Sequence, residues 1–228
     1  MKKEKFDWHE FFSANLGKVM ANQMACAEHV VKDRNWGLDL QRGVISFGED
    51  EFTAQFLGGE SNSAETWLWG WENINNFPDK ILTFARKIKA IGEELDAEPL
   101  TTAEIELDDD FNGHTLSIVS VAVSKEKVCY YRGPHDGGAI FVVFSDVPEE
   151  VFAPVDAPAF AQITMQSIQS FDVDHKIFIE GFLKQNGTKY EWQGDSVIAK
   201  FESGGDLAID FEKADDGKIF RIAGIKNV

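Results

Sequence analysis

Residues 66–73 read TWLWGWEN and hold three of the chain's six tryptophans. Alternate residues of a β-strand point to the same face, so a strand here would place Trp67, Trp69 and Trp71 side by side as one aromatic slab. Such a slab is either the floor of a core or the wall of a cleft that stacks a ring or holds a cation. We expect it to be mainly core, because large aromatic side chains are usually well buried, and we keep the three tryptophans as candidate ligand-binding residues. The intervening Leu68 predicts that the strand is also covered on its other face.

Helices and short strands surround this stretch within the first 150 residues. Apolar residues at helical spacing predict a helix over residues 8–31, a second helix that begins at Pro78 and a third over about residues 110–123. Residues 116–121 could instead form a strand. The expected strands lie between glycine-containing breaks, at residues 37–40, 44–47, 52–57, 66–71, 128–132 and 139–144. The last two of these predict a hairpin across residues 133–138.

The pattern changes after residue 146. Residues 147–158 hold three prolines and no periodicity, which indicates a linker or an ordered crossover, and a short helix is expected over residues 159–170. Turn signals then separate five expected strands, at residues 176–183, 188–192, 197–201, 207–211 and 219–225. A helix followed by a five-strand antiparallel meander is typical of cystatin-like and nuclear-transport-factor-like shapes, an analogy that implies no activity. We therefore predict an α+β protein with a mixed domain over residues 1–150 and a helix-plus-meander domain over residues 151–228.

The composition argues against disordered, nucleic-acid-binding and membrane proteins. The hydrophobic fraction of 43% is that of a folded globular chain, and the net charge of −17 argues against contacts with nucleic-acid phosphates. No apolar run reaches the length of a signal peptide or a membrane span, so we expect a cytoplasmic protein that does not bind membranes. Cys26 and Cys129 are expected to be free thiols. They match no metal-ligand spacing, so we expect no metal and no cofactor; the oligomeric state stays open.

Two further stretches carry candidate sites. Arg132, His135 and Asp136 combine a guanidinium, an imidazole and a carboxylate near one turn, where they could grip an anion or form a base with its orienting partner. The alternative is that this stretch is only a structural turn, because glycine and proline are the residues that turn geometry requires. Residues 93–110 contain nine acidic and no basic residues. We interpret this run as a solvated surface or as a binding face for a basic protein partner, with Asp108–Asp110 as its candidate partner-binding residues.

Three segments together resemble a known family. The alternating-tryptophan stretch at 66–73 leads into a helix that begins with proline, Tyr130–Pro134 leads into the Gly-Gly hairpin, and residues 141–146 follow. This combination resembles the DUF6882 family of bacterial proteins of unknown function, over about residues 1–150, with the C-terminal meander as an extra part. The resemblance implies a bacterial origin and no activity.

No motif in the sequence identifies a reaction, and the sequence is compatible with two functions. The first is a non-enzymatic binding or interaction protein with an acidic surface, for example an inhibitor or immunity protein that binds a basic partner. The alternative is a small-molecule-binding protein or enzyme with a pocket in a cone-shaped C-terminal sheet. The residues expected to supply polar and aromatic groups to that pocket are Asp172, Asp174, His175, Tyr190 and Trp192.

Overall fold

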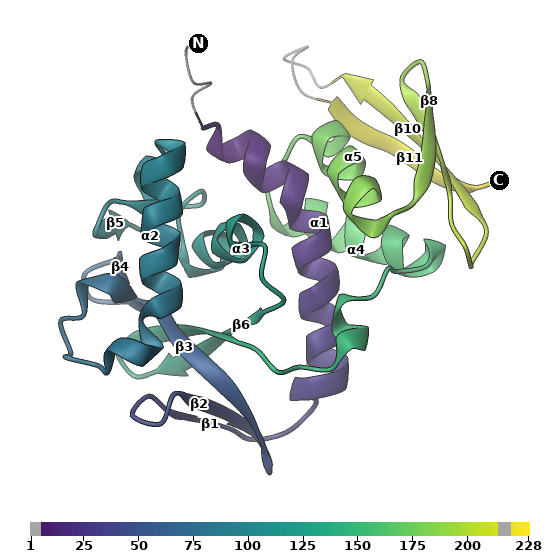
Figure 1. Ribbon diagram of the computed structural model, residues 1–228. Helices are drawn as coiled ribbons and strands as arrows, with labels where there is room; N and C mark the ends of the chain where they lie inside the picture. The colour runs from purple at the N-terminus through teal and green to yellow at the C-terminus, as the bar shows by residue number, and fades with distance from the viewer. Residues whose placement is uncertain (1–5, 214–219) are drawn as a thin grey trace. The chain divides into compact units, whose positions relative to one another are not determined.

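The computed structural model describes residues 6–213 and 220–228 and shows an α+β protein with antiparallel sheets (Figure 1). The chain divides into two compact units. The first contains Gln23–Val151, and the second contains Trp8–Asn22 together with Phe152–Val228. Helix α1 (Trp8–Cys26) therefore contributes to both, and a π-helical turn at Ala27–Val31 extends it as far as the sequence predicts. No helix among the described residues is long and apolar enough to cross a bilayer.

A seven-stranded antiparallel sheet forms the frame of the first unit. Its long strand β3 pairs at its start with β2, at its end with β4, and along its other edge with β7. Strand β1 pairs with β2, β5 with β4, and β6 with β7. The strands are β1 (Trp36–Asp39), β2 (Val44–Phe47), β3 (Asp50–Ser61), β4 (Thr66–Trp69), β5 (Glu104–Glu106), β6 (Cys129–His135) and β7 (Gly138–Phe144).

Helices α2 (Thr83–Leu95) and α3 (Gly113–Ser124) pack on the face of this sheet that carries Trp67, Trp69 and Phe141, which we call the inner face (Figure 1). A Cβ atom on Gly113 would lie 2.2 Å from the Phe141 ring, so this glycine lets α3 start directly on strand β7. The prediction of a third helix is confirmed, and the alternative of a strand over residues 116–121 is wrong. This helix is buried almost all round, which explains its strand-like run of apolar residues.

The hairpin between β6 and β7 is tighter than the sequence predicts. Gly133, Pro134 and His135 belong to β6, and only Asp136 and Gly137 form the turn. A register with partners as far as His135 and Gly138 leaves this two-residue connection. Residues 133–138 are therefore mostly strand and not loop.

The second unit combines helices α4 (Ala157–Ser170) and α5 (His175–Asn186) with a four-stranded antiparallel meander, in the order β11-β10-β9-β8. The strands are β8 (Lys189–Gln193), β9 (Ser196–Lys200), β10 (Asp206–Lys213) and β11 (Phe220–Asn227). Residue 219, the expected start of the last strand, lies outside the described residues.

The predicted strand over residues 176–183 is wrong, because this segment lies in helix α5. Among the residues that the structure describes, the meander therefore has four strands and not five. Asp174 caps the helix by accepting the backbone N–H groups of Lys176 and Ile177, both at 2.9 Å. Gly187, which lies between the two expected strands at residues 176–183 and 188–192, ends the helix in a left-handed conformation. The intervening residues 147–158 include a 3-10 turn at Glu149–Phe152 before α4 begins.

Candidate functional site

One row of residues crosses five strands on the outer face of the first unit's sheet. Gly133 pairs with Ile140, Ile140 with Gly59, Gly59 with Leu68, and Leu68 with Glu104. Residues directly opposite each other in antiparallel strands share a face, so these five residues form a line from β6 to β5. Helices α2 and α3 cover the inner face, and the middle of this outer row forms the floor of a hollow.

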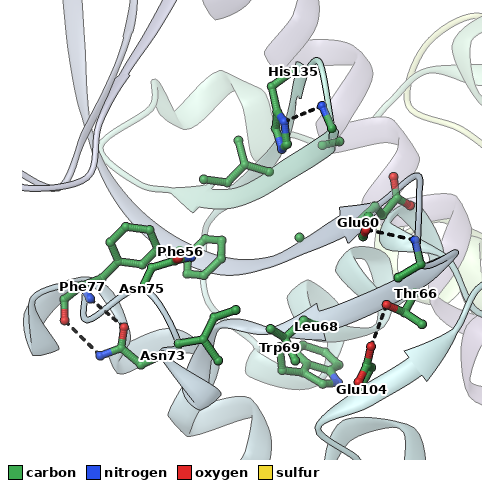
Figure 2. Close-up of a pocket in the computed structure, with 17 residues that line it drawn as sticks. Phe56, Glu60, Thr66, Leu68, Trp69, Asn73, Asn75, Phe77, Glu104 and His135 are labelled. Carbon is green, nitrogen blue, oxygen red and sulfur yellow. Dashed lines mark hydrogen bonds between the residues drawn. The ribbon is translucent and has the colours of Figure 1, made fainter.

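The hollow has a volume of about 480 Å³ and is mostly apolar (Figure 2). The end of the β6–β7 hairpin forms one side, a loop over residues 73–77 forms another, and Glu104 of β5 lies at its rim. We call it the outer groove. Its lining residues include Phe56, Gly59, Leu68, Ile74, Phe77, Glu104, His135 and Ile140.

Two neighbouring glycines explain why the floor of the outer groove is bare. A Cβ atom on Gly58 would lie 2.3 Å from the ring of Trp67, so the inner face requires a glycine there. A Cβ atom on Gly59 would point to the outer face, where its nearest neighbour is the Ala139 carbonyl oxygen at 3.3 Å. The absent side chain of Gly59 leaves room between Ile140 and Leu68.

The loop over residues 73–77 holds an aliphatic side chain at the mouth of the groove. Asn73 accepts the backbone N–H of Phe77 at 2.7 Å and donates its side-chain amide to the Phe77 carbonyl at 3.1 Å. The Phe77 ring packs on Phe56 with centroids 5.2 Å apart. Ile74, between these anchors, is 68% exposed. An exposed isoleucine beside an apolar hollow is typical of a binding surface.

The charge at the groove is negative. The Glu104 carboxylate accepts the Thr66 hydroxyl at 2.9 Å and is otherwise open to solvent. Glu60 is held instead toward the inner side, where it accepts the Gly113 N–H at 2.7 Å and lies 3.5 Å from the Arg132 guanidinium. None of the described lining residues is a lysine or an arginine. His135 also lines the groove, and its Nδ1 accepts the Gly137 N–H at 3.1 Å.

The three tryptophan rings lie side by side as expected, and Trp71 stacks on Trp69 with ring centroids 6.4 Å apart, although Trp71 itself lies beyond the end of strand β4. Trp67 and Trp69 lie on the inner face at 0% and 1% exposure, with their rings 5.3 Å apart, so the expectation of core is confirmed for both. Trp71 follows the strand in a 3-10 turn, where its ring lies 4.1 Å beneath the Lys89 ammonium. The expectation that the Leu68 side is also covered is wrong, because Leu68 is partly exposed on the groove floor.

The predicted group of Arg132, His135 and Asp136 is not brought together. Arg132 points to the inner face beside Glu60, whereas His135 lies on the outer face and lines the groove. Asp136 is an exposed turn residue. The alternation of side chains along β6 separates the guanidinium from the imidazole, so they cannot act on one group.

Sequence reasoning missed one polar cluster beneath α3. The Nδ1 atom of His114 lies 3.2 Å from the Tyr130 hydroxyl, and the His114 ring packs edge-on to Phe141. Burial lowers the pKa of His114, and burial raises the pKa of Tyr130. Neither residue lines the outer groove. Only the packing of α3 on β6 brings them together, since residues 114 and 130 carry no common motif.

The acidic run 93–110 spreads over several elements. Asp108 accepts the backbone N–H groups of Asp110 and Phe111, at 2.9 and 2.6 Å, and so shapes the turn before α3. Asp109 and Asp110 are exposed. In the part of the chain that the structure describes, no three histidine, cysteine or acidic residues gather in a group that could hold a metal ion.

In the second unit, the residues expected to line a pocket contact other partners. Tyr190 donates to Glu180 at 3.3 Å, and Trp192 lies 4.8 Å from the Lys176 ammonium. Asp172 pairs with Arg221, Asp174 caps α5, and His175 accepts the Ile222 N–H. A hollow of about 600 Å³ lies elsewhere, between α4 and β11, and none of these five residues lines it.

Comparison with known protein families identifies the family of this chain. A model of DUF6882, a family of unknown function, matches residues 9–147, which is more than half of the 228 residues. The matched range covers all seven strands of the first unit's sheet and therefore the whole outer groove. No curated protein and no solved structure matches the chain.

Proposed function

Since the chain belongs to the DUF6882 family, whose function is unknown, we propose a function from the geometry of the groove. The protein is a non-enzymatic binding protein, and its first unit holds a partner in the outer groove. The observation that carries this proposal is the uncovered row of Ile140, Gly59 and Leu68, with Ile74 exposed at its mouth. Exposed apolar surface in a concave setting marks interaction and ligand sites.

The partner that fits this surface is basic. Glu104 stands at the rim, no lysine or arginine is among the described lining residues, and the chain has a net charge of −17. Asp108–Asp110 follow β5 and add further negative charge near that edge of the sheet. Complementary charge speeds association and disfavours acidic competitors. An inhibitor or immunity protein that binds a basic protein in the bacterial cytoplasm is one concrete form, and the free thiols of Cys26 and Cys129 fit that compartment.

Site-specific photocrosslinking tests the proposal. A benzophenone amino acid at Ile74 should give a discrete crosslinked product in cells that naturally make the protein. The substitution Gly59→Leu fills the groove floor and should remove that product. A crosslinker at Glu93, an exposed position on α2, is the matched control and should not give the same product. No product from Ile74, or a product that persists with Gly59→Leu, would contradict the proposal.

A second candidate function concerns the other unit. The hollow between α4 and β11 supports small-molecule binding, with Met165 on its wall 43% exposed. We retain a cystatin-like or nuclear-transport-factor-like shape as part of this proposal. Nile red, a neutral apolar dye, is a suitable probe: Met165→Lys should lower its fluorescence if the dye occupies this hollow, and an unchanged signal would count against the site.

A further inference from the structure

The edge of the first unit's sheet next to the outer groove is an open strand. Within residues 6–213 and 220–228, strand β5 pairs only with β4 and ends the sheet on that side. Trp69 donates its backbone N–H to Ala103 at 3.1 Å, Leu107 donates to Glu65 at 2.9 Å, and Ile105 is the partner of Trp67. These odd-numbered residues therefore direct their backbone groups toward β4.

The backbone groups of Glu104 and Glu106 consequently point away from the sheet, because successive residues of a strand direct them to opposite sides. Neither residue has a backbone hydrogen-bond partner among the described residues. Unpaired N–H and C=O groups along an edge are a template for another strand. The edge is short, exposed and continuous with the groove floor through the pairing of Glu104 with Leu68.

The side chains of β5 specify what that added strand would carry. Glu104 and Glu106 both lie on the outer face and are exposed, since they pair with Leu68 and Thr66. Ile105 lies on the inner face and is partly exposed. An added strand places residues i and i+2 opposite the two glutamates and residue i+1 beside Ile105. Opposite charges stabilise such cross-strand pairs, so the positions favour a basic, an apolar and a basic residue.

We propose that the partner of the outer groove is an extended basic–apolar–basic segment of another protein, which adds to β5 as a further strand and sets its basic side chains opposite Glu104 and Glu106, beside the groove floor. This inference rests on the proposed function of the first unit as a binding protein. A second copy of the chain is the weaker occupant, because no described strand carries basic residues two positions apart. Its net charge of −17 would also repel a second copy.

Two synthetic peptides test the inference by fluorescence anisotropy. One alternates lysine and valine over eight residues, and the other has the same composition with the lysines in one block. Strand addition predicts that the alternating peptide binds at least about fivefold more tightly, because only it sets lysines opposite both glutamates and, at the same time, a valine beside Ile105. Its affinity should fall as salt rises. Equal affinity for the two peptides, or no binding of the alternating one, would overturn the inference.

Substitutions on β5 separate charge from backbone pairing. Glu106→Gln keeps the outward N–H group and removes only the charge, whereas Glu106→Pro removes both and leaves the bonds to β4 intact. The proline variant should bind the alternating peptide several-fold more weakly than the glutamine variant, and equal affinities would count against strand addition. Glu93→Gln on α2 is the charge control and should have little effect. Circular dichroism checks that each variant is folded, and Glu104→Pro repeats the test at the other outward position.

The two proposals can fail separately. If the Ile74 crosslink depends on Gly59 but persists with Glu106→Pro, the groove binds a partner without strand addition. If the crosslink is absent altogether, the binding function itself fails.

Discussion

The backbone of Gly58 packs directly against the indole of Trp67. A Cβ atom on this glycine would lie 2.3 Å from the ring and 2.7 Å from the Leu68 carbonyl oxygen. Both neighbours are held firmly, since Trp67 is fully buried and Leu68 is part of the β3–β4 pairing. Gly58 thus allows the Trp67 ring to pack directly on the inner face of strand β3. The next residue of the same strand, Gly59, leaves the outer groove open on the opposite face.

Gly58→Ala should destabilise the protein by about 3 kcal/mol, because neither neighbour can move away from the added methyl group. Gly59→Ala is the matched control, and it should change stability by less than about 1 kcal/mol, since its methyl group enters the open groove and the unfolded chain loses freedom. Urea unfolding followed by tryptophan fluorescence measures both. Equal effects of the two substitutions would contradict the assignment of Gly58 to the core face and Gly59 to the groove.

Trp69→Ala should lower the free energy of unfolding by roughly 3–5 kcal/mol, the cost of emptying a large aromatic site. The Trp69 indole is buried and donates to the Pro99 carbonyl at 3.1 Å, so Trp69→Phe, which loses this hydrogen bond but keeps an aromatic ring, should cost less. Thermal melting of the three proteins ranks them. A Trp69→Ala protein that melts like the parent would show that this tryptophan is not a core residue.

The burial of Trp67 and Trp69 can be predicted from the sequence, because the alternation of side chains along a strand depends only on neighbouring residues. Trp67 and Trp69 are two residues apart, and that spacing alone places them on one face. The same alternation shows why Arg132 and His135 separate, once β6 is known to extend through His135. The position of the turn between β6 and β7 could not be predicted from the glycines of residues 133–138. It depends on the register in which the two strands pair.

Other features depend on contacts between residues far apart in the chain. Residues 176–183 are rich in strand-forming residues, yet they form α5, where Gly181 packs on the Ala14 backbone and the Phe182 ring stacks on Phe160 at 4.3 Å. Tertiary packing overrides the local preference there. The outer groove is likewise invisible in the sequence, because its floor joins residues 59, 68 and 140 from three strands.

The segment before α4 should resist proteolysis, despite its prolines. The buried side chain of Asn186 accepts the Val155 N–H at 2.7 Å and donates to the Val155 carbonyl at 2.9 Å. Lys18 donates to the Phe152 and Ala153 carbonyls, at 2.9 and 3.0 Å. Asn186→Ala leaves both groups of Val155 without this partner and should cost about 2 kcal/mol.

Limited digestion with a nonspecific protease, read by mass spectrometry, checks this prediction. The Asn186→Ala protein should be cut between residues 152 and 156 faster than the parent. Gln185→Ala is the control, because its exposed amide bonds to Ala14 and Asn15 and not to this segment. Rapid cleavage of the parent at the same place would show that the segment is a mobile linker.

Acid should loosen the contact between α5 and β11 through His175. Its Nδ1 accepts the Ile222 N–H at 3.0 Å, and Arg221 approaches its Nε2 at 3.1 Å. Burial, and next the Arg221 charge, lower the pKa of His175, although Asp174 and Asp172 act in the opposite direction. A proton on Nδ1 would remove the acceptor for Ile222. Because the folded pKa is below the unfolded value of about 6.5, this contribution to stability is complete above pH 6.5 and is lost as the pH falls from there through the folded pKa.

The protection factor of the Ile222 amide in hydrogen exchange reports this contact directly. It should fall in the parent as the pH is lowered from about 7 to 5. In His175→Gln the side-chain carbonyl can still accept the Ile222 N–H and does not titrate, so the protection factor should lose most of its pH dependence. The pKa of His114 is also lowered by burial, so the His175→Gln protein should still lose some global stability in acid. If Ile222 protection falls equally in both proteins, His175 is not the group that titrates.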